Sequence, residues 1–314
     1  MEPGNQNKQL SLACLLPTGS ASEEIEGISH LFEHIFATIL HNRCPCAYQK
    51  LRVHGHTTED YVILFCSHFT TENILQTLSG MKFAEIDLDY QKQQLKNEIE
   101  RETSNREEFF FRFVWEGTDY EKSPLGSIAR VDTITAAILE DFRRQLINKN
   151  ILFYSRDKGI EILNLSNSET SPVPGKPLSL PIAQSWRKSR PFREKLYDIY
   201  YFNRDIEAFY LLERVLKELN PARHIQVSEK KYMSAMIIEK GAAFPSGQDI
   251  RFLEEKAFEG INRDLGDIKA NFREQAVNEL ESVYFYGQQW QDRVVRLFNT
   301  TERRLVELVK QIKI

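Results

Sequence analysis

The sequence predicts an α+β protein of two domains, and three observations support this. The chain has 314 residues, about twice the length of an average domain. Both halves follow the same order of strand, helix, strands and helices. Between the halves lies a stretch rich in Pro, Ser and Asn, the composition of a linker. We therefore place the first domain at 1–163, the linker at 164–191 and the second domain at 192–314.

The first elements follow from the spacing of apolar residues. The short apolar run from Leu10 to Leu16 ends at a Pro-Thr-Gly-Ser turn and indicates a buried strand. From Glu23 to His41, apolar residues recur at steps of three and four, which predicts a helix with one buried face. A strand from Tyr61 to Phe65 and a short helix over 72–78 follow.

A long helix is expected next, from about Tyr90 to beyond Asn105 and into an aromatic stretch. It ends before Ser123-Pro124-Leu125-Gly126, because proline and glycine interrupt helices. A capped helix over 135–148 and a strand over 151–154 complete the first half. The second half is predicted to contain a strand at 195–201, a helix at 205–219, a strand at 231–238 and long helices from 249 onward.

Composition excludes several classes of protein. With 41% apolar and 27% charged residues, the chain has the make-up of a globular protein. A net charge of −4 without a Lys/Arg stripe argues against a nucleic-acid binder. The start lacks a signal sequence, and no segment approaches the length of a membrane span, so we expect a cytoplasmic protein without a membrane span.

The four cysteines are too few for a disulfide framework in a chain of this size. Cys14, Cys44, Cys46 and Cys66 are therefore predicted to be reduced thiols. Cys44-Pro45-Cys46 lacks both the spacing and the second pair that a zinc site of cysteines requires.

The segment His30-Leu31-Phe32-Glu33-His34 carries the chemistry of the first predicted helix. His30 and His34 are four residues apart and lie one turn above the other, so both imidazoles can reach one ion. Glu33 projects beside them and is free to activate a water as general base. This H-x-x-E-H order is the inverzincin motif, and it predicts a zinc peptidase site.

A catalytic zinc site commonly has three protein ligands, so one more is needed. The helix that contains Leu95 to Glu102 offers three carboxylates. Glu98 and Glu102 share one helical face, whereas Glu100 points elsewhere. Spacing alone leaves the choice between Glu98 and Glu102 open.

The chain resembles the insulinase/pitrilysin family, which includes the mitochondrial processing peptidases. The match runs through Gly27-Ile28-Ser29 and the His-x-x-Glu-His segment, and continues at Asn97-Glu98-Ile99 and Ser123-Pro124-Leu125-Gly126. The resemblance implies two related α/β sandwich domains, each a mostly antiparallel sheet covered by helices, which together form one half of a clamp. It also implies Zn²⁺ bound by His30, His34 and Glu98, with Glu102 as the fallback ligand.

Three features differ from the family pattern. Gln91 stands where the family often has an acidic residue, seven positions before the third ligand, and the stretch from His34 to Glu98 is shorter than usual. The second domain of complete family enzymes supplies an Arg and a Tyr that stabilise the oxyanion. Arg223 and Tyr232 are the candidates here, nine residues apart instead of seven.

The resemblance leads to two hypotheses about function. The first is a zinc-dependent endopeptidase subunit that cleaves short or unfolded peptides, for example to remove a leader peptide, with Glu33 as base. Its partner would be a homologous subunit in a heterodimer, with a homodimer as the other arrangement. The segment from His56 to Tyr61 resembles the family's edge strand, to which a peptide substrate adds as a further strand. The alternative is a non-catalytic scaffold or core subunit of the same fold.

Overall fold

The computed structural model describes residues 11–43, 53–102, 112–165, 186–192, 195–202 and 206–313. It divides the chain into two compact units. The first contains residues up to 173 together with 271–280, and the second contains 174–270 together with 281–314. Most of the predicted linker lies outside the described residues, and the domain boundaries remain a prediction.

The first unit is built on a five-stranded antiparallel sheet with the strand order β2-β3-β1-β4-β5. Its strands are β1 (Leu12–Leu16), β2 (Val53–Thr57), β3 (Val62–Cys66), β4 (Ile151–Ser155) and β5 (Gly159–Leu163). Its helices are α1 (Ile28–Asn42), α2 (Thr71–Gly80), α3 (Leu88–Glu102), α5 (Ile128–Thr133) and α6 (Ala136–Ile147), with 3₁₀ turns η3 (Ser20–Ser22), η4 (Phe83–Glu85) and η5 (Asp119–Glu121).

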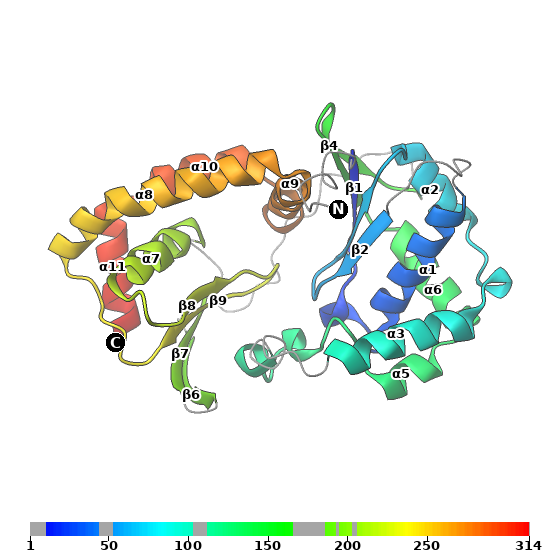
Figure 1. The fold of residues 1–314 in the computed structure, drawn as a ribbon, viewed down its shortest axis with the longest axis horizontal. Coiled ribbons are helices and arrows are strands. Elements are labelled where there is room, and N and C mark those ends of the chain that lie inside the picture. The colour runs from blue at the N-terminus through cyan, green and yellow to red at the C-terminus, as the bar shows by residue number, and fades with distance from the viewer. Residues whose placement is uncertain are drawn as a thin grey trace. The chain divides into compact units, whose positions relative to one another are not determined.

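Helices α1, α2, α3 and α6 lie on one side of this sheet (Figure 1). Alternate strand residues such as Cys14, Leu64 and Phe153 join their core on that side. On the opposite face, the ring centroids of Tyr154 and Phe272 are 6.0 Å apart. The start of helix α9 (Phe272–Tyr286) therefore covers the second face of the sheet.

The second unit repeats the plan with a four-stranded antiparallel sheet in the order β6-β7-β9-β8. Its strands are β6 (Trp186–Phe192), β7 (Lys195–Phe202), β8 (Ile225–Ser228) and β9 (Ser234–Glu239). Its helices are α7 (Ile206–Leu219), α8 (Gly247–Ala270), α10 (Trp290–Phe298), α11 (Glu302–Lys313) and the end of α9. A separate apolar core lies between this sheet and α7, α8 and α11.

The predicted α+β class, with two helix-covered antiparallel sheets, is confirmed. Cys14 and Cys66 are buried free thiols, as expected, whereas Cys44 and Cys46 lie outside the described residues. Among the helices that the structure describes, none combines the length and apolarity needed to cross a membrane.

Several element boundaries differ from the prediction. The first helix begins at Ile28 and not at Glu23, because the chain before it forms η3 and a turn. The edge strand occupies 53–57, and Thr58 then closes the turn to β3 by accepting the N–H of Tyr61 and donating its own backbone N–H to the Tyr61 carbonyl. Residues 186–191, assigned to the linker, belong to β6. Strands β5 and β8 were not predicted, since each is short and only partly apolar.

Candidate metal centre

Helix α1 presents two faces with different chemistry. One face packs in the core through its apolar residues Ile28, Leu31, Phe32, Ile35, Phe36 and Leu40. The polar face carries His30, Glu33 and His34 and is adjacent to α3 and the edge strand β2. The 3.6-residue period of the helix produces this division, as the sequence pattern predicted.

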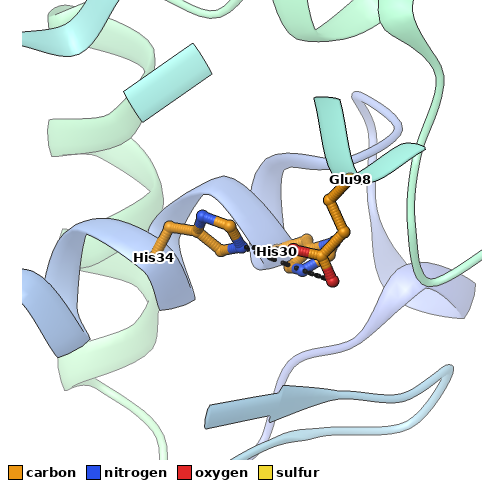
Figure 2. A group of neighbouring side chains, drawn as sticks. All are labelled: His30, His34 and Glu98. Carbon is orange, nitrogen blue, oxygen red and sulfur yellow. Dashed lines mark hydrogen bonds and ion pairs between the residues drawn. The ribbon is translucent and has the colours of Figure 1, made fainter. Parts of the chain in front are cut away.

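The two histidines and Glu98 converge on one point (Figure 2). The Nε2 atoms of His30 and His34 are 3.2 Å apart. The Glu98 carboxylate reaches them from α3, with Oε2 at 3.3 Å from His34 Nε2 and Oε1 at 3.8 Å from His30 Nε2. Leu95 and Ile99 bury the adjacent face of α3, and this packing directs Glu98 toward α1.

This donor set is chemically suited to zinc. Two imidazole nitrogens and a carboxylate are typical ligands of a catalytic zinc site with one open position. Ligand bonds of about 2.0–2.1 Å in tetrahedral geometry place neighbouring ligand atoms about 3.3–3.4 Å apart. The spacings of 3.2 Å between the His30 and His34 nitrogens and 3.3 Å between His34 and Glu98 are close to this value.

The electrostatics keep His30 and Glu98 ready to bind a cation. Burial, and then the neighbouring charge of His34, lower the pKa of His30 to about 4, so its ring is neutral at pH 7. The hydrogen bond with His34 lowers the pKa of Glu98, which is therefore ionised. A neutral His30 ring and an ionised Glu98 carboxylate are in the protonation states that metal binding requires.

The backbone carbonyl of Leu125 lies beside the His30 ring. It opposes the lowering of the His30 pKa, and the Nδ1 atom of the ring is buried. A proton on Nδ1 leaves Nε2 free to act as a ligand. The Pro-Leu-Gly segment singled out in the sequence thus lies beside the first histidine.

Two glycines permit this approach of the Pro-Leu-Gly segment to α1. Gly27, at the start of α1, and Gly126 both have left-handed backbone angles, with φ of +89° and +81°. A Cβ on Gly126 would lie 2.4 Å from the Cα of Gly27, which no side chain could tolerate. Glycine is therefore required at 126 both for its backbone angle and for the contact.

The first turn of α1 is held by a buried carboxylate. Glu23 accepts hydrogen bonds from the backbone N–H groups of Gly27 and Ser29, each at 2.8 Å. These are among the donors that a helix start leaves without partners. Glu23, at which the sequence pattern predicted the helix to begin, thus lies before the helix and caps its first turn.

Glu33 lies beside the histidines, with Oε2 at 3.8 Å from His30 Nε2. Its Oε2 accepts a hydrogen bond of 3.0 Å from the Thr57 hydroxyl on β2. Burial raises the pKa of Glu33 to about 7, against the smaller opposing effects of His34 and Thr57. A carboxylate with this pKa is matched to proton transfer near neutral pH.

The other carboxylates of α3 lie away from this cluster. Glu102 accepts a hydrogen bond from Arg101 at 3.1 Å, and Glu100 is exposed. Gln91, at the position that is often acidic in the family, is buried and donates to the Thr38 hydroxyl at 3.4 Å. Gln91 thereby ties α3 to α1.

Arg223 and Tyr232 both belong to the second unit. Arg223 precedes β8 and forms an ion pair of 2.9 Å with Glu239 on β9. Tyr232 lies between β8 and β9 with 38% of its surface exposed, and the Lys231 ammonium is 5.4 Å from its ring centroid. Their role as oxyanion donors remains a prediction.

The sequence pattern did not predict the contact of Thr57 with Glu33 or the position of Leu125 beside His30. Gly55, which also lies against Glu33, directly precedes the segment that resembles the family's edge strand and was assigned no role. The available signal was a glycine between two histidines beside this segment, since a glycine in a strand often marks a close approach.

Solved structures resemble the whole chain. One chain of complex III2 from Candida albicans is 14% identical with a TM-score of 0.61, covering 98% of this chain and 88% of its own. An M16-like peptidase from Alicyclobacillus acidocaldarius is 14% identical with a TM-score of 0.60, covering 96% and 90%. An inactive M16 peptidase domain from Pseudomonas fluorescens is 12% identical with a TM-score of 0.58, covering 95% and 88%.

The periplasmic protease PqqL from Escherichia coli is 13% identical with a TM-score of 0.63, and the chain spans 44% of its length. No family model matches the sequence. No curated protein matches it either. The fold is therefore that of the M16, insulinase-type peptidases. Since the similar structures include both peptidases and an inactive domain, function has to be argued from the site itself.

Proposed function

We propose that this chain is the zinc-binding subunit of an endopeptidase that cleaves short or unfolded peptides. The convergence of His30, His34 and Glu98, with Glu33 beside them, carries the proposal. A scaffold of the same fold has no need for a buried imidazole, a second partly buried imidazole and a carboxylate directed at one point. Burial without such a purpose only costs free energy.

His30, His34 and Glu98 would hold the metal. When bound there, a zinc ion supplies a Lewis acid that polarises a peptide carbonyl and lowers the pKa of water. Glu33 accepts the proton of the attacking water and later delivers it to the amine that leaves. Its pKa of about 7 allows the carboxyl to act in both directions. The contact with Thr57 keeps the carboxylate at one position meanwhile.

A homologous subunit would complete the enzyme as a heterodimer that encloses the peptide, with removal of a leader peptide as one suitable task. In this arrangement the oxyanion donors are Arg223 and Tyr232, or groups of the partner. The alternative, a non-catalytic core subunit, shares the fold and predicts neither zinc nor turnover.

Zinc analysis and cleavage assays test the proposal. We expect about one zinc per chain after dialysis, and cleavage of unfolded peptides in the presence of a related subunit. Glu33→Gln should retain the zinc and lose about 10²–10⁴-fold in kcat, because it removes the base and no ligand. A chain that binds no zinc would establish the scaffold alternative. A Glu33→Gln variant with unchanged turnover would exclude Glu33 as base.

A further inference from the structure

The edge strand β2 lies against the helical face that carries Glu33. Gly55 and Thr57 are two residues apart on this strand, so they face the same side of the sheet. The Thr57 hydroxyl donates to Glu33 Oε2 at 3.0 Å. Glu33 thus contacts the strand through one oxygen, and the position of Gly55 explains where the rest of the carboxylate lies.

The Glu33 side chain occupies the space that a side chain at position 55 would need. A Cβ on Gly55 would lie 1.9 Å from Glu33 Oε1, 2.3 Å from its Cδ and 2.6 Å from its Cγ. Contacts below 3.0 Å are essentially never observed for a real Cβ. The carboxylate therefore lies directly over the strand backbone, and only 7% of the Glu33 residue is exposed.

The backbone at Gly55 gives no other reason for glycine. Unlike Gly27 and Gly126, Gly55 does not have a left-handed φ, so any residue could adopt its conformation. Glycine within a strand normally weakens the strand and often marks a close approach of another group. Here the group that approaches is Glu33.

We propose that Gly55 and Thr57 form a seat that positions the Glu33 carboxylate beside the two histidines. Gly55 supplies the space, and Thr57 fixes one oxygen. Both are positioning residues, because they act through Glu33. Only the consequence for turnover rests on the proposed peptidase function, whereas the contact itself can be tested without metal or substrate.

A double-mutant cycle tests the seat in the metal-free, full-length chain. Gly55→Ala should reduce the folding equilibrium constant about tenfold or more, because the added methyl group overpacks a filled site. In a Glu33→Ala background the same substitution should be neutral or stabilising, because the obstructing carboxylate is gone. Urea unfolding of the four proteins measures the coupling. An equal loss in both backgrounds would overturn the seat.

Turnover provides the second test. Thr57→Val keeps the shape of the side chain but removes the hydroxyl, so kcat should fall about tenfold with KM and zinc content unchanged, while Thr57→Ser should restore kcat. Equal kcat in Thr57→Val and the parent would remove Thr57 from the seat. These rates are measured with a homologous subunit present. If the parent cleaves no peptide even with that subunit but the stability cycle shows coupling, the peptidase function fails and the seat stands.

Discussion

Glu33 in the first unit and Glu239 in the second are buried to a similar degree, with 7% and 5% of their surface exposed. Their pKa values nevertheless shift in opposite directions, to about 7 for Glu33 and about 2 for Glu239. Glu239 bonds to Lys195 and Arg223 at 2.8 and 2.9 Å and accepts the backbone N–H of His224. Glu33 accepts a hydrogen bond from one hydroxyl, that of Thr57. Among the described residues, no lysine or arginine forms an ion pair with it.

The contrast shows that the partners of a carboxylate decide the direction of its pKa shift. Glu239 is covered mostly by its own cationic partners near the surface, since Lys195 and Arg223 are 54% and 44% exposed in their side chains. Its negative charge is therefore satisfied. Glu33 is enclosed by α1 and β2, and its pKa near 7 is consistent with the role of general base that we propose for it.

The largest expected effect concerns the proposed zinc ligands of the first unit. Glu98→Ala should lower the affinity for zinc by at least about 100-fold, because even changes outside the ligand set cost 10–100-fold. Glu102→Ala is the matched control on the same helix and should leave zinc content unchanged. Competition with a chelator measures both. Zinc loss in Glu102→Ala alone would move the third ligand one turn along α3.

The second prediction concerns the peptidase activity of the isolated chain, in which Arg223 forms an ion pair with Glu239. We expect the isolated chain to be weakly active or inactive, and a homologous partner to restore peptide cleavage by about 10²–10³-fold, the usual value of an oxyanion donor. Full activity of the homogeneous chain alone, abolished by Arg223→Ala or Tyr232→Phe, would contradict this. It would assign both donors to this sequence despite the ion pair.

The third prediction compares the loss of stability when a glycine with a left-handed φ is replaced by alanine in each unit. Gly126→Ala should destabilise the first unit by about 3 kcal/mol or more, since a left-handed φ and a contact of 2.4 Å both oppose the methyl group. Gly241, near Arg223, has a φ of +88° but a nearest contact of 3.5 Å. Gly241→Ala should cost only about 1–2 kcal/mol. Similar losses in urea unfolding would show that the contact between Gly27 and Gly126 is dispensable.

The smallest effect is the pH dependence of Glu239. Its pKa is lower in the folded protein than in an unfolded chain, where it is about 4.3. Its contribution to stability is therefore present above pH 4.3 and is lost as the pH falls from there to about 2. Solvent screening of the exposed partners limits it to about 1 kcal/mol. Glu239→Gln should flatten this part of the stability profile, and an unchanged profile would show that the ion pairs contribute nothing.

Local patterns in the sequence determined much of the first helix and of the cluster on it. The apolar period identified α1 and placed His30, Glu33 and His34 together on its other face. It could not locate the helix start, because Glu23 continues the helical pattern but is used as a cap. Nor could spacing choose between Glu98 and Glu102, since both lie on one face of α3.

The sequence by itself determined the α+β class, the helix with the His-x-x-Glu-His order and the chemistry of its side chains, because periodicity and side-chain type act over one or two turns. The family resemblance implied Glu98 as the third ligand, but only the tertiary structure decided that Glu98 meets the histidines, that Leu125 lies beside His30, and that Gly55 leaves room for Glu33. These contacts join segments 22 to 95 residues apart. They depend on how α3, the Pro-Leu-Gly segment and β2 pack against α1, which no local pattern encodes.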